Sequence, residues 1–281
     1  HRKLQRDEIF LIFAEINKRK MELPASFIDY TRALLGDEEY DKLAVALQQE
    51  PPVSIRLNQL KINHSLSDKV PWSSEGFYLE ERLTFTFDPL FHAGCYYVQE
   101  ASSMFVEQVL RQYITGPMKM LDLCAAPGGK STELGAKLMG KGVLIANDIS
   151  NSRAKALLKN LELFGVSNIC VTSETPEKLA SVYPEYFDKI LVDAPCSGEG
   201  MFRKDADMVK DWLEHGPAYY APIQKEILHQ AVAMLKPGGM MVYSTCTFDK
   251  REDEEQVLAL LETYPEMEVV PLPRFAGACD S

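Results

Sequence analysis

From about residue 119 onward the sequence alternates short apolar runs with helix-forming stretches, and this alternation limits the possible fold more than any other feature. The apolar runs predict five strands, near 119–123, 143–147, 168–172, 188–192 and 240–244. The stretches between them predict helices near 131–139, 151–164 and 218–235, with a final helix near 251–263. Strand followed by helix, repeated, is typical of a parallel sheet with helices on both faces. This part of the chain is therefore predicted to be α/β.

The chain before this alternation has a different pattern. An apolar stripe at helical spacing lies within residues 1–20, which are either a natural N-terminal extension or added sequence, because the chain begins at His1. Two helices are predicted next, over 21–35 and from Asp37, as N-cap, to Gln49. Short strands are predicted at 54–58, 76–79 and 83–87. We therefore expect a small α+β domain over 21–90, and a larger domain over 91–281 that opens with a helix over 99–113.

Length, cysteine usage and charge limit the class of protein. The 281 residues can hold one large α/β domain, or a medium domain with a smaller companion. No apolar run approaches the roughly 18 residues of a membrane-spanning helix. The six cysteines are scattered singly, without metal-type spacing, which indicates free thiols, a cytoplasmic setting and no metal. The net charge of -11 argues against a surface coated in positive potential, although a local basic groove can still bind nucleic acid.

A loop of small residues follows the first predicted strand, with the sequence Cys124-Ala125-Ala126-Pro127-Gly128-Gly129-Lys130. Small residues let backbone amides approach a ligand, and the next helix presents its N-terminus there. The loop lacks the GxGxxG spacing of dinucleotide sites and the glycine spacing of a Walker loop. These absences leave a nucleoside-containing ligand other than NAD or ATP.

Two acids stand where the next two strands end. Asp148 follows the second strand about twenty residues after the loop, a place from which an acid can accept hydrogen bonds from ribose hydroxyls. An N-cap for the helix that begins near Ser152 is the alternative, and the nearby loop favours ribose. Glu174 follows the third strand and could reach the nucleobase, although acids are common in surface loops.

The fourth predicted strand ends in Asp193, and Pro195, Cys196 and two glycines follow it. Ligands of open α/β sheets bind beyond the carboxyl ends of strands, so Asp193 and Cys196 are placed for chemistry. A buried cysteine beside a turn explains Cys196 almost equally well. A second cysteine, Cys246, stands in an equivalent place just past the fifth strand, and this favours a catalytic role for Cys196.

These motifs together resemble the Nop/Sun family of RNA cytosine-5 methyltransferases. The resemblance is carried by the loop at 121–130, the run Asp193–Gly200, the Ser-Thr-Cys-Thr run at 244–247 and the segment 91–104. The run Met201-Phe202-Arg203-Lys204 is most similar to the bacterial RsmF-type branch, which acts on 16S ribosomal RNA. The resemblance covers residues 21 to 275, and three motifs in one order make it specific. It implies a Rossmann-like class I fold, with the closing strands and any C-terminal RNA-binding domain outside this sequence.

The resemblance also implies the cofactor and the roles of the site residues. S-adenosylmethionine is expected as methyl donor, bound by the loop Cys124–Lys130, Asp148, Glu174 and Asp193. Cys246 is expected to be the nucleophile, and Cys196 to help release the product. A thiolate that adds to carbon 6 of cytosine makes carbon 5 able to attack a methyl group. Asp193 is placed to hydrogen-bond the N3 and amino edge of the base.

The expected partner is RNA, either 16S ribosomal RNA or the small ribosomal subunit, and the expected state is a monomer that binds no membrane. Arg56, Arg203 and Lys204 are predicted to line a basic groove, with solvated loop charges as the alternative for the last two. Two other functions stay open at this point. A DNA cytosine-5 methyltransferase would use Cys196 as nucleophile. A non-catalytic RNA-binding scaffold could retain the fold, although both cysteines and the strand-end acids are intact.

Overall fold

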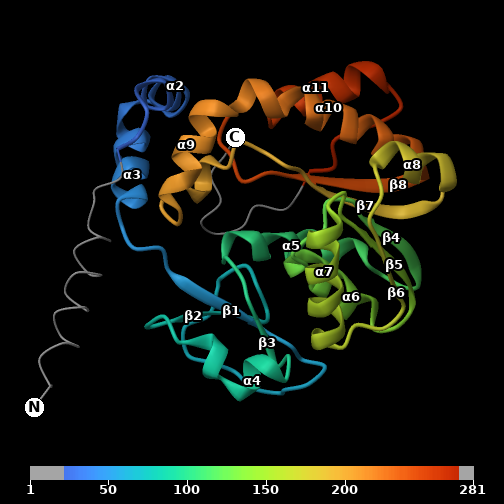
Figure 1. Cartoon of the computed structure of the whole chain (residues 1–281). Helices are drawn as coiled ribbons and strands as arrows, with labels where there is room; N and C mark the ends of the chain where they lie inside the picture. The colour runs from blue at the N-terminus through green and yellow to red at the C-terminus, as the bar shows by residue number, and fades with distance from the viewer. Residues whose placement is uncertain (1–21, 272–281) are drawn as a thin grey trace, which may run out of the picture. The chain divides into compact units, whose positions relative to one another are not determined.

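A computed structural model of the chain describes residues 22–271, so the helix predicted within 1–20 lies outside it (Figure 1). The described residues form two compact units. The smaller unit takes the chain up to Pro51 together with Ser197–Gly216 and Cys246–Asp249. The larger unit contains Pro52–Cys196, Pro217–Thr245 and the chain from Lys250 onward. The domain boundary expected at residue 90 stays a prediction.

The larger unit is built on a five-stranded sheet with the order β6-β5-β4-β7-β8, and all four pairings are parallel. Its strands are β4 (Met118–Asp122), β5 (Gly142–Asn147), β6 (Ile169–Thr172), β7 (Phe187–Asp193) and β8 (Leu235–Ser244). These are the five predicted strands, so the α/β class is confirmed. The strand order reverses between β4 and β7, and ligands of open α/β sheets bind beyond the carboxyl ends at such a point.

Helices connect the strands of this sheet. They are α6 (Gly129–Leu138), α7 (Asn151–Phe164), α8 (Pro176–Val182), α10 (Pro217–Met234) and α11 (Glu254–Thr263). The sequence analysis missed α8, which begins with an N-cap Thr175 that accepts a hydrogen bond from the N–H of Lys178 and with Pro176 in the first turn. No helix within residues 22–271 is long and apolar enough to cross a membrane.

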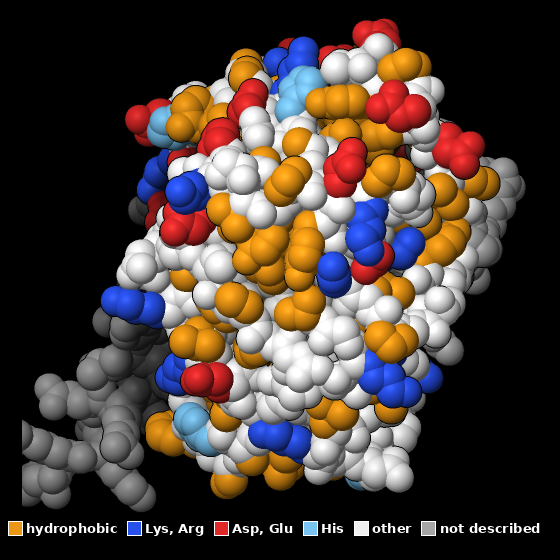
Figure 2. Space-filling model, turned by 90° about the vertical axis from the view of Figure 1, so that its right-hand side faces the viewer, with side chains coloured by type: hydrophobic (Ala, Val, Ile, Leu, Met, Phe, Trp, Pro, Cys, Tyr) orange, Lys and Arg blue, Asp and Glu red, His pale blue; other side chains and the backbone are white. Residues whose placement is uncertain are grey.

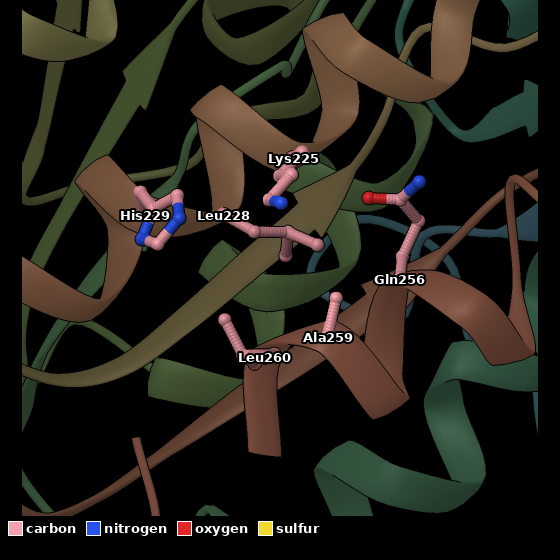
Figure 3. Close-up of a pocket in the computed structure, with 6 residues that line it drawn as sticks. All are labelled: Lys225, Leu228, His229, Gln256, Ala259 and Leu260. Carbon is pink, nitrogen blue, oxygen red and sulfur yellow. The ribbon is translucent and has the colours of Figure 1, made fainter. Parts of the chain in front are cut away.

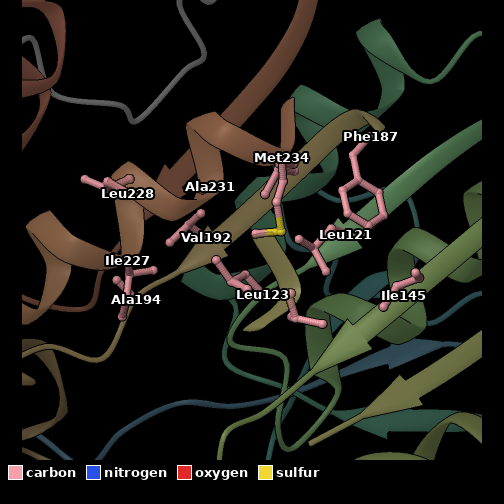
Figure 4. Close-up of a cluster of buried hydrophobic side chains, with 12 residues drawn as sticks. Leu121, Leu123, Ile145, Phe187, Val192, Ala194, Ile227, Leu228, Ala231 and Met234 are labelled. Carbon is pink, nitrogen blue, oxygen red and sulfur yellow. The ribbon is translucent and has the colours of Figure 1, made fainter. Parts of the chain in front are cut away.

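Apolar side chains cover both faces of the sheet. Leu121 and Met120 are neighbours on β4, so their side chains point to opposite faces. Leu121 belongs to a cluster between the sheet and α10 (Figure 4), with contributions from Phe187, Ile190, Val192, Leu228, Ala231 and Met234. Met120 belongs to a cluster on the other face, formed with Leu134 and Leu138 of α6 and Leu144 of β5. The sheet is therefore held between helices, as the alternation predicted.

A second, antiparallel sheet with the order β2-β1-β3 also belongs to the larger unit. Strands β1 (Val53–Leu57) and β2 (Gly76–Leu79) were predicted, whereas β3 (Tyr96–Val98) was missed. The strand predicted at 83–87 is wrong, because the chain forms a 3-10 helix, η1 (Phe85–Phe87), followed by α4 (Pro89–His92). Asp88 accepts a hydrogen bond from the N–H of Leu90 at the start of α4, and this local capping bond favours the helical conformation.

The segment between this sheet and β4 is helical in two pieces rather than one. The 3-10 helix η2 (Ser102–Phe105) precedes α5 (Val106–Tyr113), where one helix over 99–113 was predicted. Residues 236–239 form an irregularity inside the bounds of β8, because Leu235 pairs with Phe187 and Met240 with Lys189.

The smaller unit consists of helices, namely α2 (Ala25–Leu35), α3 (Asp37–Leu47), the 3-10 helix η3 (Glu199–Met201) and α9 (Ala206–Glu214). Gly36, at φ 79°, ends α2 and is the N-cap of α3, so Asp37 lies in the first turn rather than at the N-cap. The core of the unit joins segments far apart in sequence. The Phe27 ring lies 5.2 Å from that of Phe202 and 6.1 Å from that of Trp212.

The core position of Leu121 gives a test of the larger unit. Leu121 is fully buried on the central strand β4, so Leu121→Ala should lower the free energy of unfolding by about 2–5 kcal/mol through lost burial and the resulting cavity. Leu258→Ala on α11, where the side chain is 58% exposed, should change it by less than about 0.5 kcal/mol. Urea unfolding followed by circular dichroism measures both, and equal losses would contradict the assigned core.

Candidate active site

Polar side chains of neighbouring strands meet at the carboxyl edge of the five-stranded sheet. Asp193 ends β7, and both of its carboxylate oxygens have partners. The Nζ of Lys130, in the first turn of α6, lies 2.6 Å from Oδ2, and the Ser244 hydroxyl at the end of β8 donates to Oδ1 at 2.8 Å. Asp193 therefore joins three elements at the point where the strand order reverses, and it lies beside the end of the loop 124–130.

The loop 124–130 is held from the side by α7. Asn160 donates a hydrogen bond to the carbonyl of Pro127 at 2.8 Å, and Arg153 donates to that of Ala126 at 2.9 Å. The Ala125 N–H donates to the Asn147 carbonyl at 2.7 Å. Gly128 has φ 113°, and a Cβ there would lie 3.1 Å from the Leu157 side chain. The loop therefore fits this space only with glycine, and it leads directly into α6.

The N-terminus of α6 is open to a ligand. Its N-cap, Gly128, has no side chain, and no side-chain cap bond is present. The first N–H groups of a helix have no partner within the helix and attract negatively charged or carbonyl oxygens. Cys124 contributes its position in the loop rather than a thiolate, because burial raises the pKa of its thiol to about 12.

Asp122, at the end of β4, was not assigned a role from the sequence. It is fully buried, and the Ser131 hydroxyl donates to its Oδ2 at 2.5 Å. Its Oδ1 has no hydrogen-bond partner among the described residues. Burial, together with the charges of Asp193 and Asp148, raises the pKa of Asp122 to about 7, against the effects of Ser131 and Lys130. An acid that directly ends an apolar strand was the available signal, the same signal that identified Asp193.

The two remaining predicted acids differ in their surroundings. Asp148 is buried; its Oδ1 accepts from the Ser150 N–H at 3.0 Å and its Oδ2 lies 3.3 Å from Arg153. It is not the N-cap of α7, which is Ser150. Glu174 is exposed, and its backbone is fixed by the Asn147 side chain, which exchanges two hydrogen bonds with it. The side chain of Asp148 is thus held in place by hydrogen bonds, whereas for Glu174 the hydrogen bonds from Asn147 hold only the backbone.

The segments that carry the two cysteines are hydrogen-bonded to each other within each unit. In the larger unit the Ala194 N–H donates to the Ser244 carbonyl at 2.9 Å. In the smaller unit the Gly200 N–H donates to the Cys246 carbonyl at 2.9 Å. Cys196 is half-buried and Cys246 is exposed. Because Cys196 and Cys246 belong to different units, the convergence of their thiols on one base stays a prediction.

Buried polar residues hold the segment before Cys196 in place, and no pattern in the sequence predicts them. The Gln224 side chain on α10 is fully buried, and its Nε2 donates to the Pro195 carbonyl and to Glu252 Oε1, both at 2.9 Å. The Tyr243 hydroxyl donates to the backbone carbonyl of Glu252 at 2.6 Å. Gln224 thereby positions the peptide that leads into Cys196.

The assignment of Arg56 to an RNA groove is corrected by its surroundings. Its side chain is only 3% exposed and donates to Gln99 at 2.8 Å, to the Gly129 carbonyl at 2.9 Å and to Thr132 at 2.6 Å. A guanidinium with these bonds is not placed to contact phosphate. Arg56 instead joins β1 to the first turn of α6, next to the loop 124–130.

Arg203 and Lys204 lie between η3 and α9 in the smaller unit, where Arg203 is half-buried and Lys204 is exposed. Their role at an RNA surface stays a prediction. On the face shown in Figure 2, the Lys and Arg side chains (blue) are interspersed with acidic (red) and apolar (orange) ones rather than gathered in one patch.

The hollow between α10 and α11 is not a ligand site. Lys225, Leu228, His229, Gln256, Ala259 and Leu260 line it, as Figure 3 shows. Its volume of about 10 Å³ is scarcely that of one water molecule. The carboxyl edge of the sheet therefore remains the candidate site of the larger unit.

Comparison with known proteins shows the family of the chain. Residues 115–279 match the family model of the 16S rRNA methyltransferases RsmB/F, which covers all strands and loops of the site. The chain belongs to this family. Residues 23–101 match the N-terminal domain of the 16S rRNA methyltransferase RsmF. Methyltransferases of this family use S-adenosylmethionine, so the predicted family and its cofactor are confirmed.

Individual relatives give the same picture. The chain is 38% identical to the ribosomal RNA small subunit methyltransferase F of Citrobacter koseri over 91% of its own length, and 38% identical to that of Klebsiella pneumoniae over 92%. It spans 57% and 58% of these two relatives.

Two solved structures from Pyrococcus horikoshii share the fold. A methyltransferase homolog protein is 30% identical, with a TM-score of 0.69 over 86% of this chain and 84% of its own. NSun6 with SFG is 22% identical, with a TM-score of 0.77 over 92% of each chain. The predicted Rossmann-like class is thereby confirmed.

The buried Asp122 predicts a specific pH dependence of stability. Its pKa is raised from 3.8 to about 7, so between these values the folded protein keeps a proton that the unfolded chain has released. Stability contributed by this proton is present at low pH and is lost as the pH rises toward 7. Asp122→Asn should remove that loss and gain stability over the wild type with rising pH, by at most about 4 kcal/mol. Urea unfolding between pH 4.5 and 8 measures the difference, and parallel curves for the two proteins would contradict the raised pKa.

Proposed function

We propose that this chain transfers a methyl group from S-adenosylmethionine to carbon 5 of a cytosine in small-subunit ribosomal RNA. The observation that carries the proposal is Asp193, held by Lys130 and Ser244 at the switch point of the sheet, on the segment that leads to Cys196. The family membership of the chain and the hydrogen bonds between the two cysteine-bearing segments also support the proposal. The cytoplasmic location and monomeric state expected from the sequence are part of this proposal.

The residues at the carboxyl edge suit the cofactor. S-adenosylmethionine supplies a methyl group on a positively charged sulfur, and it also carries an ammonium group, a carboxylate and ribose hydroxyls. The N-terminus of α6 and Lys130 suit its carboxylate, and the buried acids Asp122 and Asp148 and the half-buried Asp193 suit its positive charges and hydroxyls. The Asp122 Oδ1, which lacks a partner in the described residues, marks a place for a donor. We assign the loop Cys124–Lys130, Asp148 and Asp193 to this site, with the exposed Glu174 at its rim.

The two cysteines are assigned different steps. The Cys246 thiolate adds to carbon 6 of the cytosine, which makes carbon 5 nucleophilic. Asp193, fixed by Lys130, accepts a hydrogen bond from the amino group of the base and orients it. After methyl transfer a base takes the proton from carbon 5, and the electron pair of that bond re-forms the double bond between carbons 5 and 6 and expels the Cys246 thiolate. Cys196, whose backbone is positioned through Pro195 and Gln224, assists this release.

RNA is the proposed substrate, and the target base must leave its stack to reach the site. Arg203 and Lys204 are proposed phosphate contacts, because they belong to the extension that resembles the RsmF branch. A DNA cytosine-5 methyltransferase with Cys196 as nucleophile is the second candidate, favoured by the Pro195-Cys196 pair alone.

Asp148 gives a test of the cofactor site. If its carboxylate accepts from both ribose hydroxyls, Asp148→Asn should weaken S-adenosylmethionine binding by roughly 10- to 100-fold, because hydrogen bonds to charged groups contribute about 1.5–3 kcal/mol. Asn retains an acceptor for the Ser150 N–H, so the loop should keep its shape. Titration calorimetry measures the affinity, with Asp188→Asn at the start of β7 as the control acid. Unchanged affinity in Asp148→Asn would remove Asp148 from the site.

The cysteines give the test of the reaction. With tritiated S-adenosylmethionine and 16S ribosomal RNA, Cys246→Ala should form no covalent adduct and transfer no methyl group. Cys196→Ala should methylate and then remain bound to RNA as an adduct on a denaturing gel, because attack is intact and release is slowed. Cys95→Ala, which removes a cysteine of the antiparallel sheet, serves as the control.

The opposite pattern, with the adduct lost in Cys196→Ala and retained in Cys246→Ala, would assign the nucleophile to Cys196. Methyl transfer to DNA in preference to RNA would support the second candidate. No transfer to either nucleic acid by the unaltered protein would support a scaffold.

A further inference from the structure

A cavity of about 280 Å³ lies between the antiparallel sheet and α7, outside the residues assigned to the reaction. Five aromatic rings line it, those of Phe85, Phe91, Tyr96, Tyr97 and Phe164, together with Leu163 of α7. All of these residues belong to the larger unit, on η1, α4, β3 and α7 (Figure 1). Its volume falls at the lower limit of ligand sites, roughly 300–1,000 Å³, which suits one flat ring better than an extended molecule.

The walls of this aromatic pocket are held in place by buried polar bonds. Asn58 donates to the carbonyls of Gly94 at 2.8 Å and of Phe164 at 2.6 Å, and so joins the segment before β3 to the end of α7. The Tyr96 ring lies 6.1 Å from Phe85 and 5.9 Å from Phe91. The pocket is therefore formed before any ligand arrives, which lowers the entropic cost of binding.

The pocket shares a wall with the cofactor loop. Asn160 and Tyr97 line the pocket, and both donate hydrogen bonds to the carbonyl of Pro127, at 2.8 Å and 3.4 Å. A ligand in the pocket is thus separated from the loop 124–130 by a single layer of side chains. Such a ligand would lie beside the reaction site without entering it.

Basic side chains surround the pocket in a chain that is acidic as a whole. Lys61 donates to the Leu163 carbonyl at 2.5 Å, directly on the pocket wall. Lys155 and Lys159 are exposed and precede Leu163 on α7 at i, i+4, i+8 spacing, so the three share one helix face. Glu162 is the exposed acid of this stretch, and Asp88 is occupied by the Tyr96 hydroxyl at 2.6 Å. Aromatic rings beside lysines match a base attached to a phosphate backbone.

We propose that the aromatic pocket binds an unpaired nucleobase of the substrate RNA other than the target cytosine, while Lys155 and Lys159 contact the adjoining phosphates. This inference rests on the proposed function, because it assigns part of the same RNA to a second place. Stacking of one base holds the strand against the cofactor loop and limits how the target base can approach the site.

Filling the pocket tests the inference. Leu163→Trp places an indole where the base would stack, and Leu158→Trp places one on the same helix at a residue that is 40% exposed and does not line the pocket. Fluorescence anisotropy with 16S ribosomal RNA transcribed in vitro should show roughly 5- to 100-fold weaker binding for Leu163→Trp, since one stacked base contributes about 1–3 kcal/mol. Leu158→Trp should bind like the unaltered protein. The slope of log K against log salt should stay the same in both, because phosphate contacts are unchanged.

A second variant guards against misfolding. Phe91→Leu keeps an apolar side chain in the pocket and removes one aromatic face, and it should also weaken RNA binding while calorimetry shows unchanged S-adenosylmethionine affinity. Ultraviolet cross-linking of the RNA to the unaltered protein should attach to peptides that contain residues 85–98 or 160–164.

RNA binding by Leu163→Trp and Phe91→Leu equal to that of the unaltered protein would overturn the inference, as would cross-links that avoid both peptides. Either result with normal methyl transfer to 16S ribosomal RNA leaves the proposed function standing and removes the RNA base from the pocket. Absence of methyl transfer by the unaltered protein counts against the proposed function itself.

Discussion

The ion pair between Lys130 and Asp193 determines the arrangement of the site more than any other interaction. It joins the first turn of α6 to the last residue of β7 across the point where the strand order reverses, with 2.6 Å between Nζ and Oδ2. The pair is shielded from solvent more than a surface pair, so its attraction is screened less by water and salt. Ser244 occupies the other oxygen, which requires the register that places Asp193 opposite Ser244. A shift in either strand would break this bond and move both segments that lead to the cysteines.

Two buried acids near Asp193 have fewer hydrogen-bond partners than Asp193 itself. Asp122 has one oxygen without a partner in the described residues, and neither oxygen of the buried Glu133 on α6 has a hydrogen bond there. Burial raises the pKa of both acids to about 7. Arg56 lies 4.0 Å from Glu133 yet makes its hydrogen bonds to Gln99, Thr132 and the Gly129 carbonyl. Native structures leave few buried polar atoms without a hydrogen-bond partner, so these two acids differ from Asp193, both of whose oxygens are paired.

The sheet was predictable from sequence because its strands contain continuous apolar runs that end in polar residues, and such runs alternate with helix-forming stretches. The positions of Asp193 and Lys130 near the carboxyl edge of the sheet were predictable too, since Asp193 ends one predicted strand and Lys130 belongs to the loop after another. The prediction of a strand at 83–87 was wrong because it rested on apolar alternation, which does not reveal that Asp88 caps the helix α4 that follows. The prediction that Arg56 lines an RNA groove was wrong because the sequence shows the charge of this residue and not its burial. Gln224 had no signal at all, because its partners, Pro195 and Glu252, are 29 and 28 residues away.

The chain passes from the larger unit to the smaller one directly after Cys196 and again directly before Cys246, so each cysteine stands at the end of a segment rather than inside a strand. Strand residues are fixed by register, whereas segment ends can adjust their backbone angles by small amounts. The adjustment is limited on both sides of the thiols, by the bond from Ala194 to Ser244 and by the bond from Gly200 to Cys246. The proposed mechanism would use this combination, because one thiol is proposed to form a bond to carbon 6 and the other to act after the methyl group has been transferred. The buried Phe202, packed against Phe27 and Trp212, anchors the segment after Cys196, so the extension that resembles the RsmF branch has a structural role next to the proposed chemistry.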